Sequence, residues 1–391
     1  MSAAIDVLDT LAITQSRLTS ALPTPVRPWN GMTGLSGRAN LIYGPRGVGK
    51  TSLLLRQAMR TKGRYLSMDH PALYTATLYE WVNLLFERGI QAVYLDEIHA
   101  ARNWSQDLKA LYDAWPGKTI WASGSNSLLL SSGVGDLSRR FLGIRMPLLS
   151  FREFLVLRGF EDFGLQTDFE PDPLWVRRVH DACPVLSLFE EYLKTGFRPF
   201  FVEGVEDYPD KCLQTVQKTI LADIPALLPA ISQNHFRLMN AVLGYLAQSP
   251  IPVLQVNSLC REWNLGKEKL YGLLHAMEQT GILRLLRHPT DHTAMSVGAK
   301  IFLADPSLYQ VLGGKEGNTR EAFVACALES AGHRVNAAKD ETAADFIIDG
   351  RITLEVGGQR KARKRADLVI RDGADFPAPG IVPLWILGFL W

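Results

Sequence analysis

The segment from Gly44 to Thr51 reads GPRGVGKT and has the residue spacing of a loop that binds phosphate groups. Its glycines let the backbone wrap with N–H groups pointing inward, at the positive end of the helix expected to follow. Lys50 would place a positive charge on the β- and γ-phosphates, and the Thr51 hydroxyl would bind Mg²⁺. The sequence therefore predicts a site for ATP or a close relative with Mg²⁺. The predicted nucleotide-binding residues of this loop are Gly44, Pro45, Arg46, Gly47, Val48, Gly49, Lys50, Thr51 and Ser52.

Two carboxylates, Asp96 and Glu97, directly follow the apolar run at 92–95. A buried parallel strand is apolar on both faces, and ligands of open α/β sheets lie at the carboxyl ends of such strands. Asp96 is thus predicted to hold Mg²⁺ through water, and Glu97 to orient or deprotonate the attacking water. Ser123 or Ser125, which end the run TIWASGS, could read the γ-phosphate, although serines after a strand are also common turn residues.

These residues need a sheet that brings the ends of several strands together. Residues 40–43, 64–69, 92–95 and 119–125 have the composition of its strands. From Thr51 onward, leucines recur at helical spacing, so the glycine-rich turn joins a strand to a helix. This is the context that the phosphate-binding motif requires, and it predicts an α/β fold.

The composition is typical of a soluble globular protein. The 391 residues are 47% hydrophobic and 21% charged, with a net charge of +2 that carries no information about partners. The four cysteines lie far apart without metal-ligand spacing, which favours a reducing cytosol over zinc or disulfides. No signal peptide is evident. The apolar run at 381–391 is shorter than the roughly 20 residues of a spanning helix, so we expect a buried terminal strand and a cytoplasmic protein without membrane association.

Four motifs occur in order between residues 36 and 155: GPRGVGKTSLLL, VYLDEIH, ASGSNSLLL and LSRRFLGIRMPLLSFREFL. Together they resemble the prokaryotic AAA+-type ATPases whose core ends in a "PLSF-x-EF" signature. The resemblance implies a P-loop parallel sheet with strand order 5-1-4-3-2, followed by a helical lid that includes 189–201. It also implies an arginine just before the last core strand, Arg139 or Arg140, that acts as an arginine finger or sensor. A salt bridge that holds the lid is an equal alternative for this arginine.

The same resemblance divides the chain into five segments. They are an N-terminal helical segment (1–35), a P-loop AAA+-type ATPase core (36–155), a helical lid (156–232), a winged helix (233–312) and a PD-(D/E)xK nuclease-like domain (313–391). In the winged helix, three helices, the second at 256–263, precede two strands. The third helix offers Lys267, Lys269 and Tyr271 near its start, where a helix-turn-helix meets bases or phosphates. Winged helices also bind proteins, so DNA or RNA and a protein partner both stay open.

The C-terminal segment is predicted to place two carboxylates, Asp345 and Glu355, opposite each other on a hairpin. The pairing that gives 346–348 and 352–354 a common apolar face requires this arrangement. It also requires one loop residue more than a strict two-residue Asp-Gly turn. Two facing carboxylates can bind a divalent cation, and Glu321 on the preceding helix could complete the site.

This layout resembles the PD-(D/E)xK nuclease fold, but the sequence departs from its pattern. Gly357 stands where the usual lysine would be, two residues after the glutamate. Gln359 and Lys361 lie further along and could face the same side by strand alternation. Five cations follow, which would suit a phosphate backbone or form a solvated loop. They are Arg360, Lys361, Arg363, Lys364 and Arg365.

The predicted function is therefore ATP hydrolysis that involves Lys50, Thr51, Asp96, Glu97 and Arg140. The protein would act on or near nucleic acid, with a nuclease-like tail whose activity the missing lysine puts in doubt. The alternative is a nucleotide-gated protein-interaction switch without nuclease activity. A ring-forming motor would need an arginine that acts across subunits, and the oligomeric state is left open.

Overall fold

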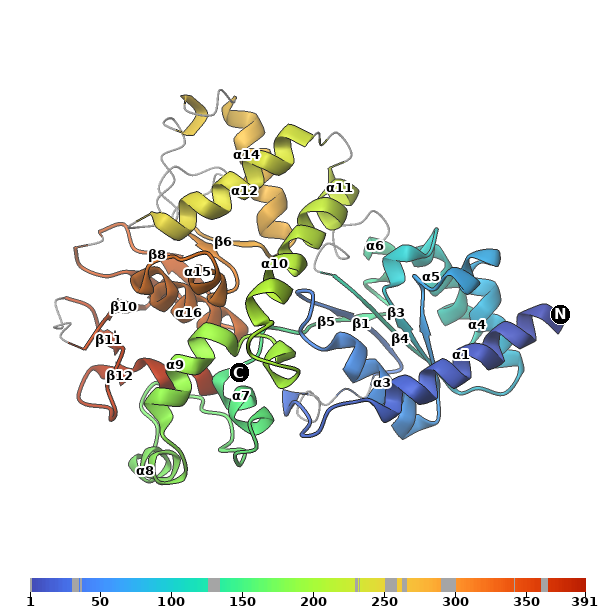
Figure 1. Ribbon diagram of the computed structural model, residues 1–391, viewed down its shortest axis with the longest axis horizontal. Helices are drawn as coiled ribbons and strands as arrows, with labels where there is room; N and C mark the ends of the chain where they lie inside the picture. The colour runs from blue at the N-terminus through green and yellow to red at the C-terminus, as the bar shows by residue number, and fades with distance from the viewer. Residues whose placement is uncertain are drawn as a thin grey trace. The chain divides into compact units, whose positions relative to one another are not determined.

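The chain divides into two compact units, Met1–Pro147 and Leu148–Trp391, in the computed structural model. Each unit contains a five-stranded sheet of its own (Figure 1). By this division, residues 148–155, expected at the end of the ATPase core, belong to the second unit. The limits of the five segments stay predictions. The residues that the structure describes are 2–29, 35, 37–125, 134–228, 231, 233–249, 259–261, 266–289, 300–340, 342–359 and 365–391.

The first unit is built on a parallel sheet. Its strands are β1 (Ala39–Tyr43), β2 (Arg64–Ser67), β3 (Ala92–Asp96), β4 (Thr119–Gly124) and β5 (Leu142–Arg145). Their order, β2-β3-β4-β1-β5, is the predicted order 5-1-4-3-2 read from the other edge, so this prediction is confirmed. Because every pair is parallel, the carboxyl ends of the strands lie along one edge of the sheet.

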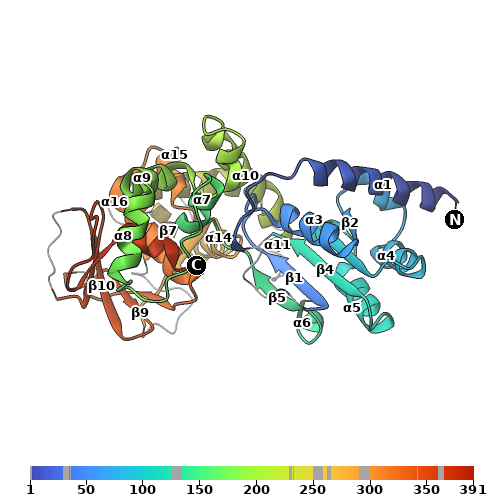
Figure 2. The same ribbon diagram turned by 90° about the horizontal axis from the view of Figure 1, so that it is seen from below.

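Helices cover both faces of this sheet (Figure 2). They are α1 (Ser2–Ser20), α3 (Lys50–Thr61), α4 (Leu78–Glu87), α5 (Trp104–Ala114) and α6 (Val134–Leu137), with short 3-10 helices η1 (Pro71–Thr75) and η2 (Ile98–Ala100). Val93 and Leu95 of β3 pack in one core with α4 and α5, whereas Tyr94 and Asp96 bond to side chains of α3. Strand alternation thus turns Asp96 towards α3.

The second unit begins with helices. They are α7 (Phe151–Leu157), α8 (Pro173–Ala182), α9 (Val185–Thr195), η4 (Pro199–Val202), α10 (Tyr208–Lys218), the π-helix η5 (Thr219–Asp223), α11 (Ile224–Leu227), α12 (Gln233–Gln248) and α14 (Lys267–Gln279). The "PLSF-x-EF" motif has a local structural role, because Ser150 and Glu153 form a capping box that starts α7. The region expected to be a lid is helical in its described part, and its role as a lid stays a prediction.

Two antiparallel strands, β6 (Leu283–Leu286) and β7 (Lys300–Leu303), follow α14. This agrees with the expected order of helices and strands. The predicted helix at 256–263 lies outside the described residues except for 259–261, which are helical. The winged helix therefore stays a prediction.

The C-terminal sheet is mixed. Its strands are β8 (Val335–Ala337), β9 (Phe346–Ile348), β10 (Ile352–Gly357), β11 (Leu368–Arg371) and β12 (Ile381–Pro383), in the order β12-β11-β10-β9-β8. The helices α15 (Ser307–Val311) and α16 (Glu316–Ser330) precede it, and α16 packs against β8 and β10.

The hairpin of β9 and β10 has the predicted register. Phe346 pairs with Leu354 and Ile348 with Ile352, so the loop holds the three residues from Asp349 to Arg351. Asp349 and Gly350 both have positive φ angles, 51° and 71°, in the left-handed region that Asp and Gly tolerate best. The predicted extra loop residue is confirmed.

The C-terminal apolar run corrects one expectation. The strand β12 ends at Pro383, and the 3-10 helix η6 (Leu384–Phe389) follows in place of a continuous strand. All six residues of η6 are buried. An apolar run is buried equally well as strand or helix, so its composition did not distinguish the two. No helix in the described parts of the chain is long and apolar enough to cross a membrane.

Candidate nucleotide site

The loop between β1 and α3 has a geometry that depends on glycine. Gly47 and Gly49 have φ angles of 75° and 99°, which residues with a side chain rarely adopt. A Cβ atom at Gly44 would lie 2.2 Å from the carbonyl oxygen of Met146. The end of β1 therefore approaches the neighbouring chain segment more closely than any side chain at this position would allow.

Lys50, the first residue of α3, is buried inside the curve of this loop. Its ammonium nitrogen donates to the carbonyl oxygens of Gly44 and Pro45, at 2.9 and 2.8 Å. A phosphate group at the start of α3 would meet both this charge and the exposed N–H groups of the first helical turn. The arrangement suits the phosphate binding predicted from the sequence.

Asp96, buried at the carboxyl end of β3, accepts hydrogen bonds from four donors. Its Oδ2 accepts from the hydroxyls of Thr51, at 2.6 Å, and Tyr65, at 2.9 Å. Its Oδ1 accepts from the Ser123 hydroxyl and, at 3.1 Å, from the Glu97 N–H. Burial and, after it, the charge of Asp96 raise the pKa of Tyr65 well above its usual range, so the phenol stays protonated and keeps donating. A hydroxyl beside a carboxylate is an oxygen donor set that fits Mg²⁺.

Glu97 contacts the phosphate-binding loop itself. Its Oε1 lies 3.6 Å from Nη1 of Arg46, and its Oε2 lies 3.4 Å from Nδ1 of His99. The residue has a φ of 46°, and the short helix η2 starts immediately after it. The predicted catalytic carboxylate therefore lies beside the loop that would hold the phosphates.

The sequence did not clearly predict the contacts of three residues in this region. Tyr65 and Ser123 bond to Asp96, and buried Arg27 donates to the carbonyl oxygens of Val48 and Pro147, at 2.9 and 3.1 Å. Ser123 is one of the two serines predicted to read the γ-phosphate, whereas the sequence predicts no role for Tyr65 or Arg27. Period-two alternation in RYLSMD could have placed Tyr65 on the α3 face, but Arg27 lies in a segment without a pattern. Ser125 is buried just after β4, and residues 126–133 lie outside the described residues.

Arg140 lies at the amino ends of the strands, whereas the phosphate-binding loop lies at their carboxyl ends. It precedes β5, whose first residue, Leu142, pairs with Asn40 near the start of β1, while the loop follows the end of β1. Its guanidinium makes two bonds of 2.9 Å to the carboxylate of Asp113. The Arg140 side chain thereby lowers the pKa of that carboxyl. This placement does not bring Arg140 to the γ-phosphate site of its own chain, and a role on a neighbouring chain stays a prediction.

Two of the three predicted cation ligands of the C-terminal segment share a lysine that was not predicted. The buried ammonium of Lys300, at the start of β7, lies 3.0 Å from Oε2 of Glu321 and 3.3 Å from Oδ1 of Asp345. Burial lowers the pKa of Lys300, but the two carboxylates outweigh it and the pKa is raised overall. Asp345 also accepts from the N–H of Val356 at 2.7 Å, and Glu355 is buried. The sequence signal that could have indicated a role for Lys300 is its place as the first residue of the otherwise apolar strand in KIFLAD.

No group of three or more His, Cys, Asp or Glu side chains in the described residues is arranged to hold a metal ion. The basic residues at 360–364 lie outside the described residues. Gln359, considered as a substitute for the missing lysine, donates to the carbonyl oxygen of Gly373 at 3.1 Å. The predicted cation site at Asp345, Glu355 and Glu321 stays a prediction.

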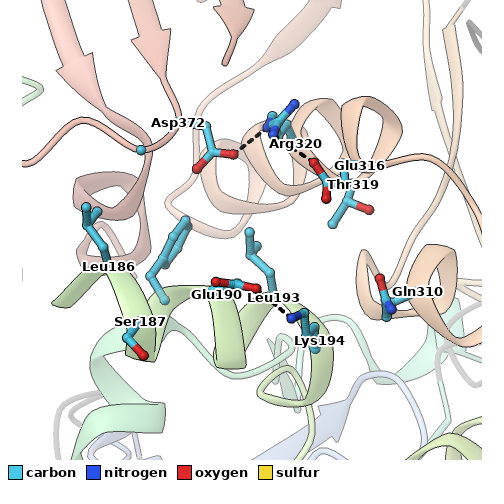
Figure 3. A pocket seen from close by; sticks show the side chains of 12 residues that line it. Leu186, Ser187, Glu190, Leu193, Lys194, Gln310, Glu316, Thr319, Arg320 and Asp372 are labelled. Atoms are coloured by element: carbon cyan, nitrogen blue, oxygen red, sulfur yellow. Dashed lines mark hydrogen bonds and ion pairs between the residues drawn. The ribbon is translucent and has the colours of Figure 1, made fainter. Parts of the chain in front are cut away.

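A cavity of about 690 Å³ lies in the second unit, lined mainly by α9 and α16 (Figure 3). Arg320 donates to Asp372 and, at 3.2 Å, to Glu316, while Lys194 donates to Glu190 at 2.6 Å. Leucine and phenylalanine side chains form the apolar part of the wall. The charged side chains named here compensate one another, so no ligand class follows from them.

Residues 36–155 match the protein-family model described as an AAA domain, over less than a third of the chain. Together with the strand order and the loop geometry, this match supports a P-loop AAA-type ATPase domain in this part of the chain. Such a domain implies nucleotide binding, usually with Mg²⁺. None of the curated proteins matches the chain.

Among solved structures, the chain is similar to the Walker-type ATPase of Pyrococcus abyssi, with 15% identity over 75% of this chain and 96% of that chain and a TM-score of 0.42. It is also similar to the RuvB Holliday junction branch migration motor of Thermotoga maritima, with 13% identity over 71% and 89% of the two chains and a TM-score of 0.32. Because both TM-scores are below 0.5, we draw nothing about function from these similarities.

Proposed function

We propose that the first unit hydrolyses ATP with Mg²⁺. The observation that carries this proposal is the 2.6 Å hydrogen bond from Thr51 to Asp96, because it brings the expected metal-binding hydroxyl and carboxylate together at the start of α3. The position of Lys50 inside the loop supports phosphate binding at the same place. Lys50, Thr51, Asp96 and Glu97 are thus the residues proposed to act in hydrolysis.

Each side chain has a role that suits its position. Lys50 and the loop N–H groups would bind and orient the phosphates and offset their charge. Thr51 and, through water, Asp96 would hold Mg²⁺, which neutralises charge on the phosphate oxygens. The hydroxyls bonded to Asp96 keep its carboxylate in place. Glu97 would orient the attacking water and accept its proton.

Two substitutions test the assignment. Lys50→Ala is expected to abolish nucleotide binding, because it removes the charge inside the loop. Glu97→Gln is expected to bind ATP and stop turnover, because the amide cannot accept the proton of water. Binding of a fluorescent ATP analogue and release of phosphate measure the two steps, with Lys211→Ala, a substitution in the other unit, as the control. ATP affinity like that of the wild type in Lys50→Ala would refute the site.

We further propose that the protein acts on or near nucleic acid. The supporting observation is that Lys267 and Lys269 are exposed in the first turn of α14, the helix expected to meet bases or phosphates. Binding through phosphates weakens as salt rises. Gel shifts at two salt concentrations, with wild type and the Lys267→Ala/Lys269→Ala variant, test this, and no binding at low salt would contradict it.

A second candidate function is a nucleotide-gated protein-interaction switch whose tail cuts nothing. It is favoured by the contacts of Lys300, because an internal ammonium compensates two of the carboxylates that a catalytic cation would need. The assay is Mg²⁺- or Mn²⁺-dependent cleavage of DNA and RNA by wild type, Asp345→Ala and Glu355→Ala. Cleavage by wild type that both variants lose would refute the switch and support the nuclease. Absence of cleavage by all three is expected for the switch.

A further inference from the structure

Arg46 is the one loop residue whose side chain reaches the proposed catalytic carboxylate among the contacts that the structure describes. Its Nη1 lies 3.6 Å from Oε1 of Glu97, and its side chain is only 11% exposed. The residue occupies the third position of GPRGVGKT, between two glycines of the loop that wraps the phosphates. The guanidinium of a loop residue therefore lies beside the carboxylate expected to orient water.

The position of Glu97 indicates which phosphate Arg46 would meet. A carboxylate that orients the attacking water must lie within hydrogen-bond reach of that water, about 3 Å, and the water must lie within about 3.5 Å of the γ-phosphorus. A group in contact with Glu97 is then close to the γ-phosphate rather than to the α-phosphate. The guanidinium has five N–H donors in a planar fork, so it can contact a carboxylate and a phosphate oxygen together.

One of the two arginines predicted for this role, Arg140, is placed elsewhere. Arg140 lies at the amino ends of β1 and β5 and is bonded twice to Asp113. Within one chain, Arg46 is therefore better placed than Arg140 to contact the γ-phosphate.

We propose that Arg46 is a catalytic residue that acts within its own chain, where its guanidinium bridges Glu97 and the γ-phosphate of ATP. This inference rests on the proposed ATPase function and deepens it. In the reaction, water oxygen bonds to the γ-phosphorus as the bond to the β-phosphate oxygen breaks, yielding ADP and phosphate, and Glu97 accepts a proton of the water. Arg46 stabilises the charge on the γ-phosphate oxygens and keeps Glu97 aligned with the water. It thus serves as an arginine finger supplied by the phosphate-binding loop.

The test compares Arg46→Ala, Arg46→Lys and, as a matched control, Arg178→Ala. For Arg46→Ala we expect kcat to fall by about 10³-fold, the lower end of the effect of an arginine finger. ADP, which lacks the γ-phosphate, should bind Arg46→Ala within about threefold of wild type, because the lost contact is made to the transferred group. Arg46→Lys keeps the positive charge but lacks the planar set of N–H donors, so its kcat should lie between those of wild type and Arg46→Ala. Arg178→Ala, which removes an arginine paired with Glu161 at 2.9 Å in the second unit, should keep wild-type kcat.

Two further measurements separate a catalytic from a structural role. Guanidinium ion at millimolar concentration should restore part of the kcat of Arg46→Ala and none of that of Arg46→Lys, whose side chain fills the site. Mixing Arg46→Ala with Glu97→Gln should recover no activity, because both groups must belong to the same site. If Arg46→Ala fails to fold, Arg46→Lys carries the test through its kcat and its unchanged ADP affinity.

The outcomes distinguish this inference from the function on which it rests. A wild type that binds and hydrolyses ATP with Arg46→Ala and Arg46→Lys at undiminished kcat would overturn the role of Arg46 and leave the ATPase standing. Recovery of activity in the mixture would overturn its action within one chain. A wild type without ATP turnover would refute the proposed function, and the role of Arg46 would fall with it.

Discussion

The ammonium of Lys300 lies 3.0 Å from a carboxylate oxygen of Glu321, and the lysine side chain is 2% exposed. Removing the lysine leaves the mostly buried carboxylates of Glu321 and Asp345, 22% and 15% exposed, without the compensating charge of its ammonium. We therefore expect Lys300→Met to lower the free energy of unfolding by about 3–5 kcal/mol at neutral pH. Urea denaturation measures the change. The control is Lys211→Met, whose partner Glu203 is largely exposed, and it should cost less than about 1 kcal/mol. Equal losses in the two variants would contradict the role of burial.

Lys300 also predicts a dependence of stability on alkaline pH. Its pKa is raised above 10.5 in the folded protein, so its contribution is complete below pH 10.5 and is lost as the pH rises through the folded-state pKa. Burial also raises the pKa of Tyr65 and Tyr309 in the folded protein, and these side chains ionise above about pH 10 once the chain unfolds, so wild type alone is not informative. The difference in unfolding free energy between wild type and Lys300→Met should shrink above pH 10.5. A difference that stays constant up to pH 12 would contradict the prediction.

Arg198 and Asp305 form a second buried ion pair, with 2.7 Å between Nε and Oδ2. Both side chains are almost completely buried, so Arg198→Met should cost about 3–5 kcal/mol of unfolding free energy. Replacing both partners removes the uncompensated charge, so the double variant Arg198→Met/Asp305→Leu should regain part of the loss. Urea denaturation of the two variants tests this. A double variant less stable than Arg198→Met would show that the pair does not behave as one unit.

Thr51 predicts a separation of metal and nucleotide binding. Its hydroxyl donates to Asp96 at 2.6 Å and is the proposed Mg²⁺ ligand. Thr51→Val keeps the shape and removes the oxygen, so ATP affinity in Mg²⁺ should fall by about tenfold or more, the effect of losing a bond to a charged group. Affinity in EDTA should change little. Thr51→Ser keeps the hydroxyl and serves as the control, and equal losses in EDTA and in Mg²⁺ would argue against a metal ligand.

Two glycines should respond to alanine in opposite ways. At Gly44 the new Cβ would lie 2.2 Å from a backbone oxygen that cannot move by itself, so Gly44→Ala should abolish ATP binding and lower the melting temperature. At Gly244, inside α12, nothing lies within 4 Å of the added atom. Gly244→Ala should therefore raise stability by about 0.5–1 kcal/mol through helix propensity. Calorimetry and nucleotide titration compare the variants. Normal ATP binding by Gly44→Ala would contradict the close approach in the structure.

Much of this protein follows from local sequence patterns. The motif from Gly44 to Thr51 is contiguous, and its glycines, lysine and threonine act through their own backbone and neighbours. An apolar run that ends in Asp96 and Glu97 is typical of a buried parallel strand. The register of β9 and β10 also followed from the sequence, because a slip by one residue would expose Phe346 and Leu354. These features depend on residues close together in the chain or on the alternation of apolar and polar residues along a strand.

The tertiary structure alone decided which distant side chains meet. Tyr65 reaches Asp96 across 31 positions, and Lys300 reaches Asp345 across 45, from strands whose pairing no local pattern specifies. The tertiary structure also decided that Arg140 lies at the amino ends of the strands, away from the phosphate-binding loop. It decided as well that the apolar residues after Pro383 form a 3-10 helix. The sequence by itself determined the phosphate-binding loop and the carboxylates, and the family resemblance of its motifs implied the strand order. Because a side chain finds its partner through packing of the whole unit, the counter-charge at Glu321 and the guanidinium at Glu97 became visible only in three dimensions.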